Sequence, residues 1–293
     1  MHPLHRFIIG KVKKIINKNN ISIICIDGPT AAGKTILAEE LSETIKNELT
    51  IDVDFYRLDW TLKDRKTREN DLKYLMKDNK PFLVEGELHM ELSKFKGFLE
   101  EIQFIKKNHF PNSSKNSNSL TLKKLYSRTN EGECIGQKEY NFSSNKKLII
   151  CEGHYTSRSE FRNLIDYNIC LLADKKELLK RKVNRVKGYR SPQKAIDYFE
   201  KIDIPSFSYH ISRFYKNVDL FVDNTNYEKP KIINYKKIST WFISGKEADK
   251  NNKIDLNNEN NFKLLFDEIF SRSKIFNSIN LSQFKRIFNL YKF

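Results

Sequence analysis

Two glycines, a lysine and a threonine stand at a fixed spacing within one short segment near the start of the chain. The segment is Gly28, Pro29, Thr30, Ala31, Ala32, Gly33, Lys34 and Thr35, which fits the pattern G-x-x-x-x-G-K-[ST] in full. The glycines let successive backbone N–H groups point inward around a polyphosphate. Lys34 can reach the β- and γ-phosphates and act in catalysis, while the Thr35 hydroxyl can ligate Mg²⁺. The segment therefore predicts a nucleoside triphosphate site.

The flanking residues predict that this loop lies between a strand and a helix. Residues 21–26 form a nearly continuous apolar run, which is typical of a parallel strand covered on both faces. Residues 34–47 contain no glycine or proline, and Leu37, Leu41 and Ile45 recur every four residues, as in a helix. The loop therefore precedes a helix N-terminus, whose positive end favours bound phosphate.

Three later apolar runs, at residues 147–151, 168–173 and 218–222, alternate with helical patterns. Strands that alternate with helices predict an α/β fold with a parallel sheet and helices on both faces. A phosphate-binding loop in such a fold is shared by ATPases, GTPases and kinases. Because no guanine-recognition motif N/T-K-x-D stands in a suitable place, an ATPase or a small kinase is favoured over a GTPase.

The stretch after the predicted helix ends in an acidic residue, two aromatic residues and a basic residue. It reads Thr-Ile-Asp-Val-Asp-Phe-Tyr-Arg over residues 50–57 and resembles the uridine kinase and phosphoribulokinase branch of P-loop kinases. In that branch the second strand ends in an aspartate that acts on the acceptor hydroxyl. The resemblance implies a P-loop NTPase fold with a five-stranded parallel sheet, and Asp54 as the catalytic base. Asp52 is the alternative, since residues two apart on a strand point to the same side.

A second part of the resemblance is an apolar strand that ends in Glu-Gly. Residues 147–155 read Lys-Leu-Ile-Ile-Cys-Glu-Gly-His-Tyr, as the third strand of the family does. This implies that Glu152 lies beside Thr35 and acts on Mg²⁺ or its waters. Glu85 and Gly86 offer the same ending after an earlier apolar run. Glu152 is preferred because a fourth-strand pattern and a basic segment follow it at the expected distances.

The basic segment after Asp174 is similar to the arginine-rich helix and lid of these kinases. Guanidinium groups form paired hydrogen bonds with phosphate and stay charged, so the resemblance implies catalytic roles for Arg181, Arg185 and Arg190. A run similar to the fifth strand ends near Asn224, which is expected to bind the nucleotide. Open α/β sheets bind ligands at the carboxyl ends of their strands. The candidate acceptor-binding residues there are Tyr56, Arg57, His154, Tyr155 and Arg158.

The sequence pattern predicts three parts. Residues 1–20 carry a basic amphipathic helix, and residues 21–228 form the P-loop kinase domain. Within that domain, residues 107–145 are rich in Ser, Asn and Lys, which predicts an insertion or mobile loop, and residues 174–215 form the lid region. Residues 229–293 are expected to be a Lys- and Asn-rich linker followed by a C-terminal helical extension.

The composition is basic, with a formal net charge of +16 over 293 residues. This charge suits a polyanionic partner, but the sequence is Lys- and Asn-rich throughout, so a nucleic-acid partner is left open and not favoured.

The four cysteines show no C-x-x-C spacing. No apolar run approaches the roughly 18 residues of a membrane span, and a secretory signal is not evident. We therefore expect a soluble cytoplasmic protein. The sequence leaves open whether the protein forms homo-oligomers.

Together these features predict an ATP-dependent kinase with Mg²⁺ as cofactor and a small hydroxylated acceptor, such as a uridine- or cytidine-like nucleoside or a sugar. Two alternatives stay open. One is a kinase that acts on a hydroxylated base within DNA or RNA. The other is a nucleic-acid-binding P-loop ATPase without a small acceptor.

Overall fold

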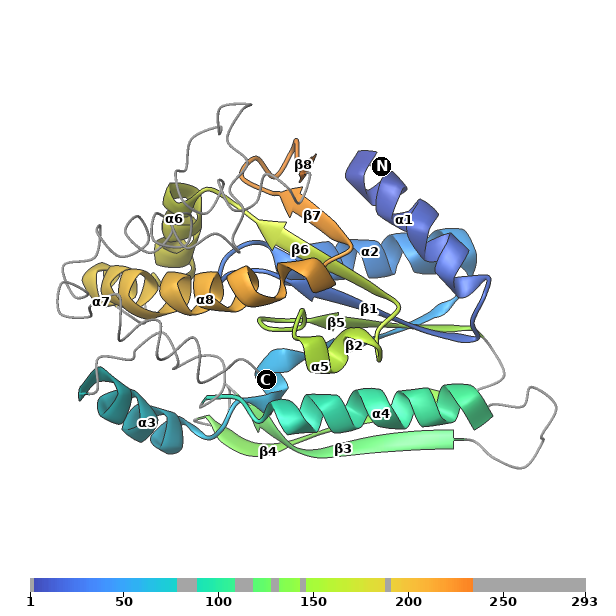
Figure 1. Cartoon of the computed structure of the whole chain (residues 1–293), viewed down its shortest axis with the longest axis horizontal. Coiled ribbons are helices and arrows are strands. Elements are labelled where there is room, and N and C mark those ends of the chain that lie inside the picture. The colour runs from blue at the N-terminus through green and yellow to red at the C-terminus, as the bar shows by residue number, and fades with distance from the viewer. Residues whose placement is uncertain are drawn as a thin grey trace. The chain divides into compact units, whose positions relative to one another are not determined.

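Five parallel strands and one antiparallel strand form the central sheet of the computed structural model (Figure 1). The structure describes residues 3–77, 89–108, 118–127, 132–142, 146–187 and 191–233. The sheet order is β2-β5-β1-β6-β7-β8. The strands are β1 (Ile21–Asp27), β2 (Asp52–Arg57), β5 (Lys147–Glu152), β6 (Tyr167–Leu172), β7 (Leu220–Asp223) and β8 (Lys231–Ile233). The predicted five-stranded parallel sheet is confirmed, and β8 adds an edge strand where a linker was expected.

Helices cover both faces of this sheet, because alternate side chains of each strand point to opposite faces. On β1, Ile24 and Ile26 pack with buried residues of α1 and α2, whereas Ile23 and Cys25 pack with buried residues of α4. β1 and β5 are buried along their whole length, which explains their continuous apolar runs. The helices are α1 (Pro3–Ile16), α2 (Lys34–Leu49), α3 (Arg65–Lys77), α4 (Leu92–Asn108), α5 (Ser159–Arg162), α6 (Lys175–Val186), α7 (Pro192–Tyr198) and α8 (Ile204–Phe214).

Three short helical turns connect these elements. They are the 3₁₀ turn η1 (Leu58–Thr61), the π-helical turn η4 (Phe199–Asp203) and the 3₁₀ turn η5 (Tyr215–Asn217). The turn η1 directly follows β2. It therefore begins at the carboxyl end of a sheet strand, which is where ligands bind in this class of fold.

A long hairpin occupies most of the segment that the sequence analysis expected to be an insertion or mobile loop at residues 107–145. Its strands β3 (Asn118–Ser127) and β4 (Glu133–Phe142) pair antiparallel and form a second sheet. Tyr140 of β4 is fully buried, and its hydroxyl donates a 2.8 Å hydrogen bond to the carbonyl oxygen of Phe55. Polar residues on the exposed side of the hairpin conceal its strand pattern in the sequence.

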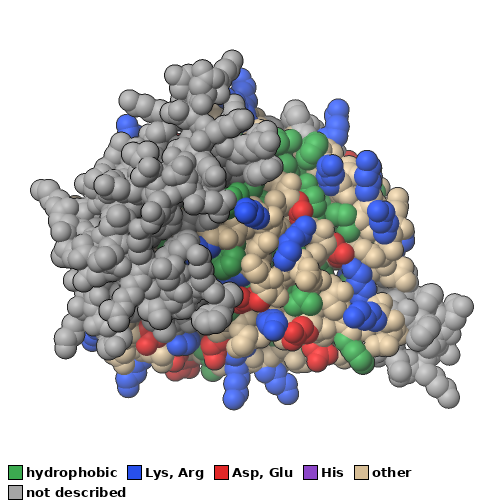
Figure 2. Space-filling view, viewed as in Figure 1, with side chains coloured by type: hydrophobic (Ala, Val, Ile, Leu, Met, Phe, Trp, Pro, Cys, Tyr) green, Lys and Arg blue, Asp and Glu red, His purple; other side chains and the backbone are tan. Residues whose placement is uncertain are grey.

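Several predicted features lie outside the described residues, namely Glu85, Arg190 and the C-terminal helical extension. In the part of the chain that the structure describes, no helix is long and apolar enough to cross a membrane. On the described part of the face in Figure 2, Lys and Arg side chains are interspersed with Asp and Glu side chains. The described part of this face therefore carries charges of both signs.

Candidate active site

The segment between β1 and α2 curls into a loop whose shape requires glycine. Gly28 has a φ of 148°, and a Cβ atom there would lie 2.4 Å from the carbonyl oxygen of Leu171. No larger residue fits between the loop and β6. The side-chain amide nitrogen of Asn224, just after β7, donates a 2.8 Å hydrogen bond to the carbonyl oxygen of Ala32. The start of the loop therefore packs against β6, and its end is hydrogen-bonded to the residue that follows β7.

Lys34 lies across this loop. Its ammonium group donates hydrogen bonds to the carbonyl oxygens of Gly28 and Pro29, at 2.8 and 2.9 Å. The side chain is 8% exposed, and burial lowers the pKa of Lys34 below its ordinary value. Both partners are neutral carbonyl groups, so the charge of Lys34 is available to a phosphate group that enters the loop.

Thr35 and Glu152 meet beside Lys34. The Thr35 hydroxyl donates a hydrogen bond of 3.2 Å to the carboxylate of Glu152, the last residue of β5. Burial raises the pKa of Glu152, although the charge of Lys34 works against this shift. The pair fits Mg²⁺, which protein sites usually hold through one or two oxygen side chains together with substrate phosphates and water. Among the described residues there is no cluster of three or more His, Cys, Asp or Glu side chains that could hold a metal by itself.

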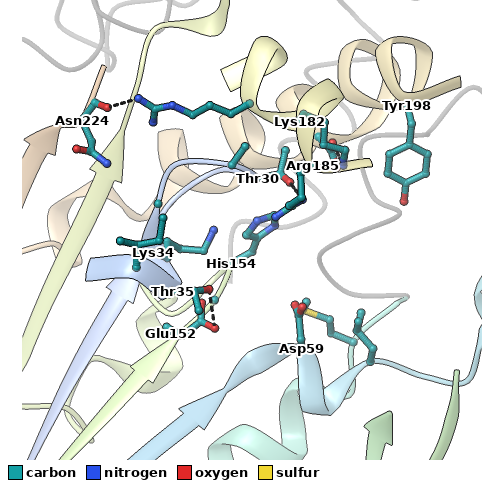
Figure 3. A pocket seen from close by; sticks show the side chains of 18 of the residues that line it. Thr30, Lys34, Thr35, Asp59, Glu152, His154, Lys182, Arg185, Tyr198 and Asn224 are labelled. Carbon is teal, nitrogen blue, oxygen red and sulfur yellow. Dashed lines mark hydrogen bonds and ion pairs between the residues drawn. The ribbon is translucent and has the colours of Figure 1, made fainter. Parts of the chain in front are cut away.

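A cavity of about 710 Å³ opens over the loop (Figure 3). Lys34, Thr35 and Glu152 line it, and so does Asp59 of η1, which the sequence analysis did not select. The carboxylate of Asp59 acts electrostatically on both of these groups: it adds to the rise that burial causes in the pKa of Glu152, and it opposes the lowering that burial causes in the pKa of Lys34. Gly153 permits this arrangement, because a Cβ atom on Gly153 would lie 2.3 Å from the Cβ atom of Leu58.

Asp54 and Asp52 do not reach this cavity. The carboxylate of Asp54 accepts a 2.7 Å hydrogen bond from the ammonium group of Lys147, and Lys138 lies 3.6 Å away. Asp52 is exposed. The physical reason is the length of β2, which continues to Arg57 and places both aspartates in its first half. The sequence does carry a signal for Asp59, since it is the first acidic residue after β2 ends.

The candidate acceptor-binding residues divide into one that lines the cavity and four that do not. His154 lines it, and burial, followed by the charge of Lys34, lowers its pKa to about 3, so the imidazole is neutral at pH 7. Tyr56 is buried against Phe98, with ring centroids 4.4 Å apart. Tyr155 packs against His210, and Arg158 pairs with Glu160. Arg57 pairs with Glu39 at 3.2 Å and lies 3.9 Å from the carboxylate of Glu152, so it borders the site through Glu152 without lining the cavity.

The two described lid arginines occupy different parts of the cavity wall. The guanidinium group of Arg185 donates a 3.0 Å hydrogen bond to the hydroxyl of Thr30 and so lies over the phosphate-binding loop. Arg181 instead pairs with Glu177 at 3.0 Å and donates to the backbone carbonyl oxygen of Asn224 at 2.9 Å. Arg185 is therefore placed to contact a phosphate group, whereas Arg181 borders the end of the cavity near β7.

A buried aspartate fixes the beginning of the loop. The carboxylate of Asp27 accepts hydrogen bonds from the backbone N–H groups of Gly28, Tyr155 and Ser157, at 2.7, 3.1 and 2.9 Å. Its other close partners are the hydroxyl of Ser157, which donates a hydrogen bond to it, and His210 of α8, whose Nε2 atom lies 3.0 Å away. Burial alone would raise the pKa of Asp27, but His210 and these hydrogen bonds outweigh it and lower the pKa to about 2. Asp27 thus joins the loop, the segment after β5 and α8.

Comparisons with known proteins agree on the fold. No protein-family model matches the sequence, and no curated protein matches it either. The structure is similar to D-glycerate 3-kinase from Cryptococcus neoformans, with a TM-score of 0.54 and 10% identity over 80% of this chain and all of that chain. It is also similar to phosphoribulokinase from Rhodobacter spheroides, with a TM-score of 0.50 and 13% identity over 70% of each chain. A possible uridine kinase from Bacillus stearothermophilus matches with a TM-score of 0.45 and 18% identity, over 68% of this chain and 87% of that chain.

The first two matches and the sheet order show that this chain shares its parallel-sheet fold, with a phosphate-binding loop after the first strand, with those two structures. The fold implied by the sequence resemblance is therefore confirmed. The low identities leave the acceptor to be inferred from the residues that line the cavity of this chain.

Proposed function

We propose that this protein is an ATP-dependent kinase that transfers the γ-phosphoryl group to a hydroxyl group of a small acceptor. The observation that carries the proposal is that one cavity joins the phosphate-binding loop, the Thr35–Glu152 pair and Asp59. The fold neighbours are themselves named as kinases, which agrees with this class of reaction. An acid in the cavity beside the phosphate-binding loop can accept the proton that an acceptor hydroxyl loses on phosphoryl transfer.

The nucleotide would bind with its phosphates in the loop, where backbone N–H groups and the N-terminus of α2 stabilise negative charge. Lys34 would exchange its two carbonyl partners for phosphate oxygens. Arg185 would contact the transferring group, since its guanidinium group already lies at the loop. Thr35 and Glu152 would hold Mg²⁺, which neutralises charge that develops on the phosphate oxygens.

The acceptor would bind on the Asp59 side of the cavity. Asp59 would accept the proton of the acceptor's hydroxyl group as the γ-phosphoryl group transfers. In this proposal Asp59 takes the role that the sequence analysis gave to Asp54. His154 is neutral at pH 7, so it can hydrogen-bond to a substrate oxygen without adding charge. A nucleoside or a sugar would fit this scheme equally well by reaction type.

The test is the transfer of labelled phosphate from ATP to a panel of nucleosides, sugars, sugar phosphates and hydroxy acids, assayed with Mg²⁺. We expect a phosphorylated product from the wild-type protein and none from Lys34→Ala, because the loop lysine stabilises the transferring group. ATP hydrolysis that DNA or RNA stimulates, without phosphorylation of any hydroxyl compound, would contradict a kinase and support an ATPase. Phosphorylation of a base within DNA or RNA alone would contradict the small acceptor.

A further inference from the structure

We propose that the acceptor carries an anionic group, a carboxylate or a phosphate, that pairs with Arg68 at the end of the cavity away from the nucleotide. This inference rests on the kinase function proposed above and specifies its substrate class. The shared chemistry is a planar set of anionic oxygens that a guanidinium group can bind through two hydrogen bonds.

Two ends of the cavity can be distinguished from the elements that line it. Asn224 and Arg181 line one end, next to β7 and α6. Arg68 and His89 line the other end, next to η1 and the start of α3. In Figure 3, Asn224 and Asp59 lie on opposite sides of the view, with Lys34 between them. A nucleotide with its phosphates at Lys34 can occupy the first end and leave the second to the acceptor.

Arg68 is held in place by neutral groups. Its Nε atom donates a 2.9 Å hydrogen bond to the carbonyl oxygen of Lys63, and its Nη2 atom donates a 2.7 Å hydrogen bond to the hydroxyl of Tyr126. The Tyr126 ring also lies under the guanidinium group, 4.8 Å from its central carbon. Tyr126 belongs to β3, so the hairpin supplies the residue that orients Arg68.

No carboxylate of the described residues forms an ion pair with Arg68. Two nearby acids of the same segment have other partners, since Asp71 pairs with Lys63 at 3.5 Å and Asp64 accepts hydrogen bonds from Thr67 at 2.7 and 2.9 Å. Among the residues that the structure describes, Arg68 forms no ion pair. A half-buried guanidinium group without an acidic partner is stabilised when an anionic ligand enters the cavity.

His89 provides a second, independent observation at the same end. Its side chain is 3% exposed, and its Nε2 atom has no hydrogen-bond partner within the described part of the chain. Burial, together with the charge of Arg68, lowers the pKa of His89 to about 4, so the ring is neutral at pH 7. Buried polar atoms are nearly always hydrogen-bonded in proteins. His89, which lines this end of the cavity, therefore retains one nitrogen that a polar group could still pair with.

The surroundings favour a specific pairing over loose attraction. Leu62 and Met90 line the same end and are joined by a backbone bridge between their segments. Apolar side chains exclude water, and charge-assisted hydrogen bonds strengthen where water is excluded. A neutral acceptor would shield Arg68 from water without pairing its charge, so the site selects against it.

The first experiment compares three matched pairs of acceptors with the wild-type protein: glycerol and glycerate, ribose and ribose 5-phosphate, uridine and uridine 5′-phosphate. We expect the anionic member of an accepted pair to have the higher kcat/KM, by roughly 10- to 100-fold, as for a hydrogen bond to a charged group. A preference for glycerate over glycerol would identify a carboxylate as the anionic group, and a preference within either of the other two pairs would identify a phosphate. Equal or better use of the neutral members would overturn this inference alone, whereas no product from any of the six would overturn the kinase function itself.

The second experiment tests Arg68 through the preferred anionic acceptor. We expect Arg68→Gln to raise KM for this acceptor by about 10-fold or more, with a smaller change in kcat and in KM for ATP. Tyr126→Phe should shift the acceptor KM in the same direction by less, because it releases the guanidinium group without removing it. Arg65→Gln, one turn earlier on an exposed position of α3, is the matched control and should behave as wild type. An unchanged acceptor KM in Arg68→Gln would overturn the proposal, as would an equal loss toward the neutral member of the pair.

Discussion

The hydroxyl of Thr35 and the carboxylate of Glu152 are joined by a 3.2 Å hydrogen bond although they lie 117 positions apart in the sequence. The cause is the pairing of β1 with β5, in which Ile26 stands opposite Glu152. Parallel strands end at the same edge of a sheet, so the last residue of β5 arrives beside the loop that follows β1. The proposed Mg²⁺ site is a product of this register.

Glu152→Gln should raise the Mg²⁺ concentration needed for half-maximal activity by about 10- to 100-fold, the range seen when a group that supports a metal ligand is lost. A titration of activity against Mg²⁺ measures this. Glu160→Gln, in α5 soon after β5, is the control and should leave the titration unchanged. An unaltered Mg²⁺ requirement in Glu152→Gln would contradict the assignment.

The pH dependence of the wild-type protein should reveal the same carboxylate. Burial raises the pKa of Glu152, so as pH falls this group is protonated earlier than an exposed glutamate. Protonation removes the charge that attracts Mg²⁺, and the apparent Mg²⁺ affinity should therefore fall on the acidic side. Glu152→Gln should lack this dependence. Binding measurements of Mg²⁺–ATP across the pH range would detect it.

Asp59→Asn should lower kcat by about 100- to 10,000-fold, the usual contribution of a positioned general base, while ATP binding stays near the wild-type value. Asp54→Asn is the matched control, since its carboxylate pairs with Lys147 outside the cavity. It should reduce stability and leave kcat close to the wild-type value. Single-turnover assays with ATP binding measured separately would distinguish the two aspartates. A larger loss in Asp54→Asn would restore the original assignment.

Arg185→Gln should reduce kcat by about 100-fold or more, as expected when a donor to a developing charge is removed. The guanidinium group already reaches the loop through Thr30. Lys180→Gln removes the same charge from an exposed position on α6, where the side chain is 70% exposed, and should have little effect. Steady-state kinetics on both variants checks the prediction, and similar losses in the two would indicate a general effect of charge.

His210→Gln should destabilise the fold by about 3 kcal/mol, because it breaks a buried pair with Asp27. Glu48→Gln removes one partner of an exposed pair with Lys13 and should cost less than about 1 kcal/mol. Urea denaturation at pH 7 compares the two variants. A loss in His210→Gln as small as in the control would show that Asp27 does not depend on this partner.

The interaction of Asp27 with His210 should also make the free energy of unfolding depend on pH. Asp27 has a pKa lowered from 3.8 to about 2 in the folded state, so its contribution is complete above pH 4 and is lost as pH falls toward 2. The contribution corresponds to about 2 kcal/mol. Asp27→Asn should lose this part of the pH dependence, which denaturation curves between pH 5 and pH 2 would show.

The sequence by itself determined the phosphate-binding loop and the parallel sheet, whereas the position of Glu152 beside Thr35 was an expectation from the family resemblance. These features depend on short-range patterns: a fixed spacing of glycine, lysine and threonine, and apolar runs that end in polar residues.

Only the tertiary structure decided which aspartate faces the loop. β2 runs three residues beyond Asp54, and the carboxylate of Asp54 pairs with Lys147 outside the cavity. The residue that lines the cavity is instead Asp59 in the turn after β2, where Leu58 approaches Gly153 closely. The hairpin was equally hidden, and with it the contact between Tyr126 and Arg68, 58 positions apart. Contacts of this kind depend on where strands end and how distant segments pack, and local patterns along one chain carry no record of either.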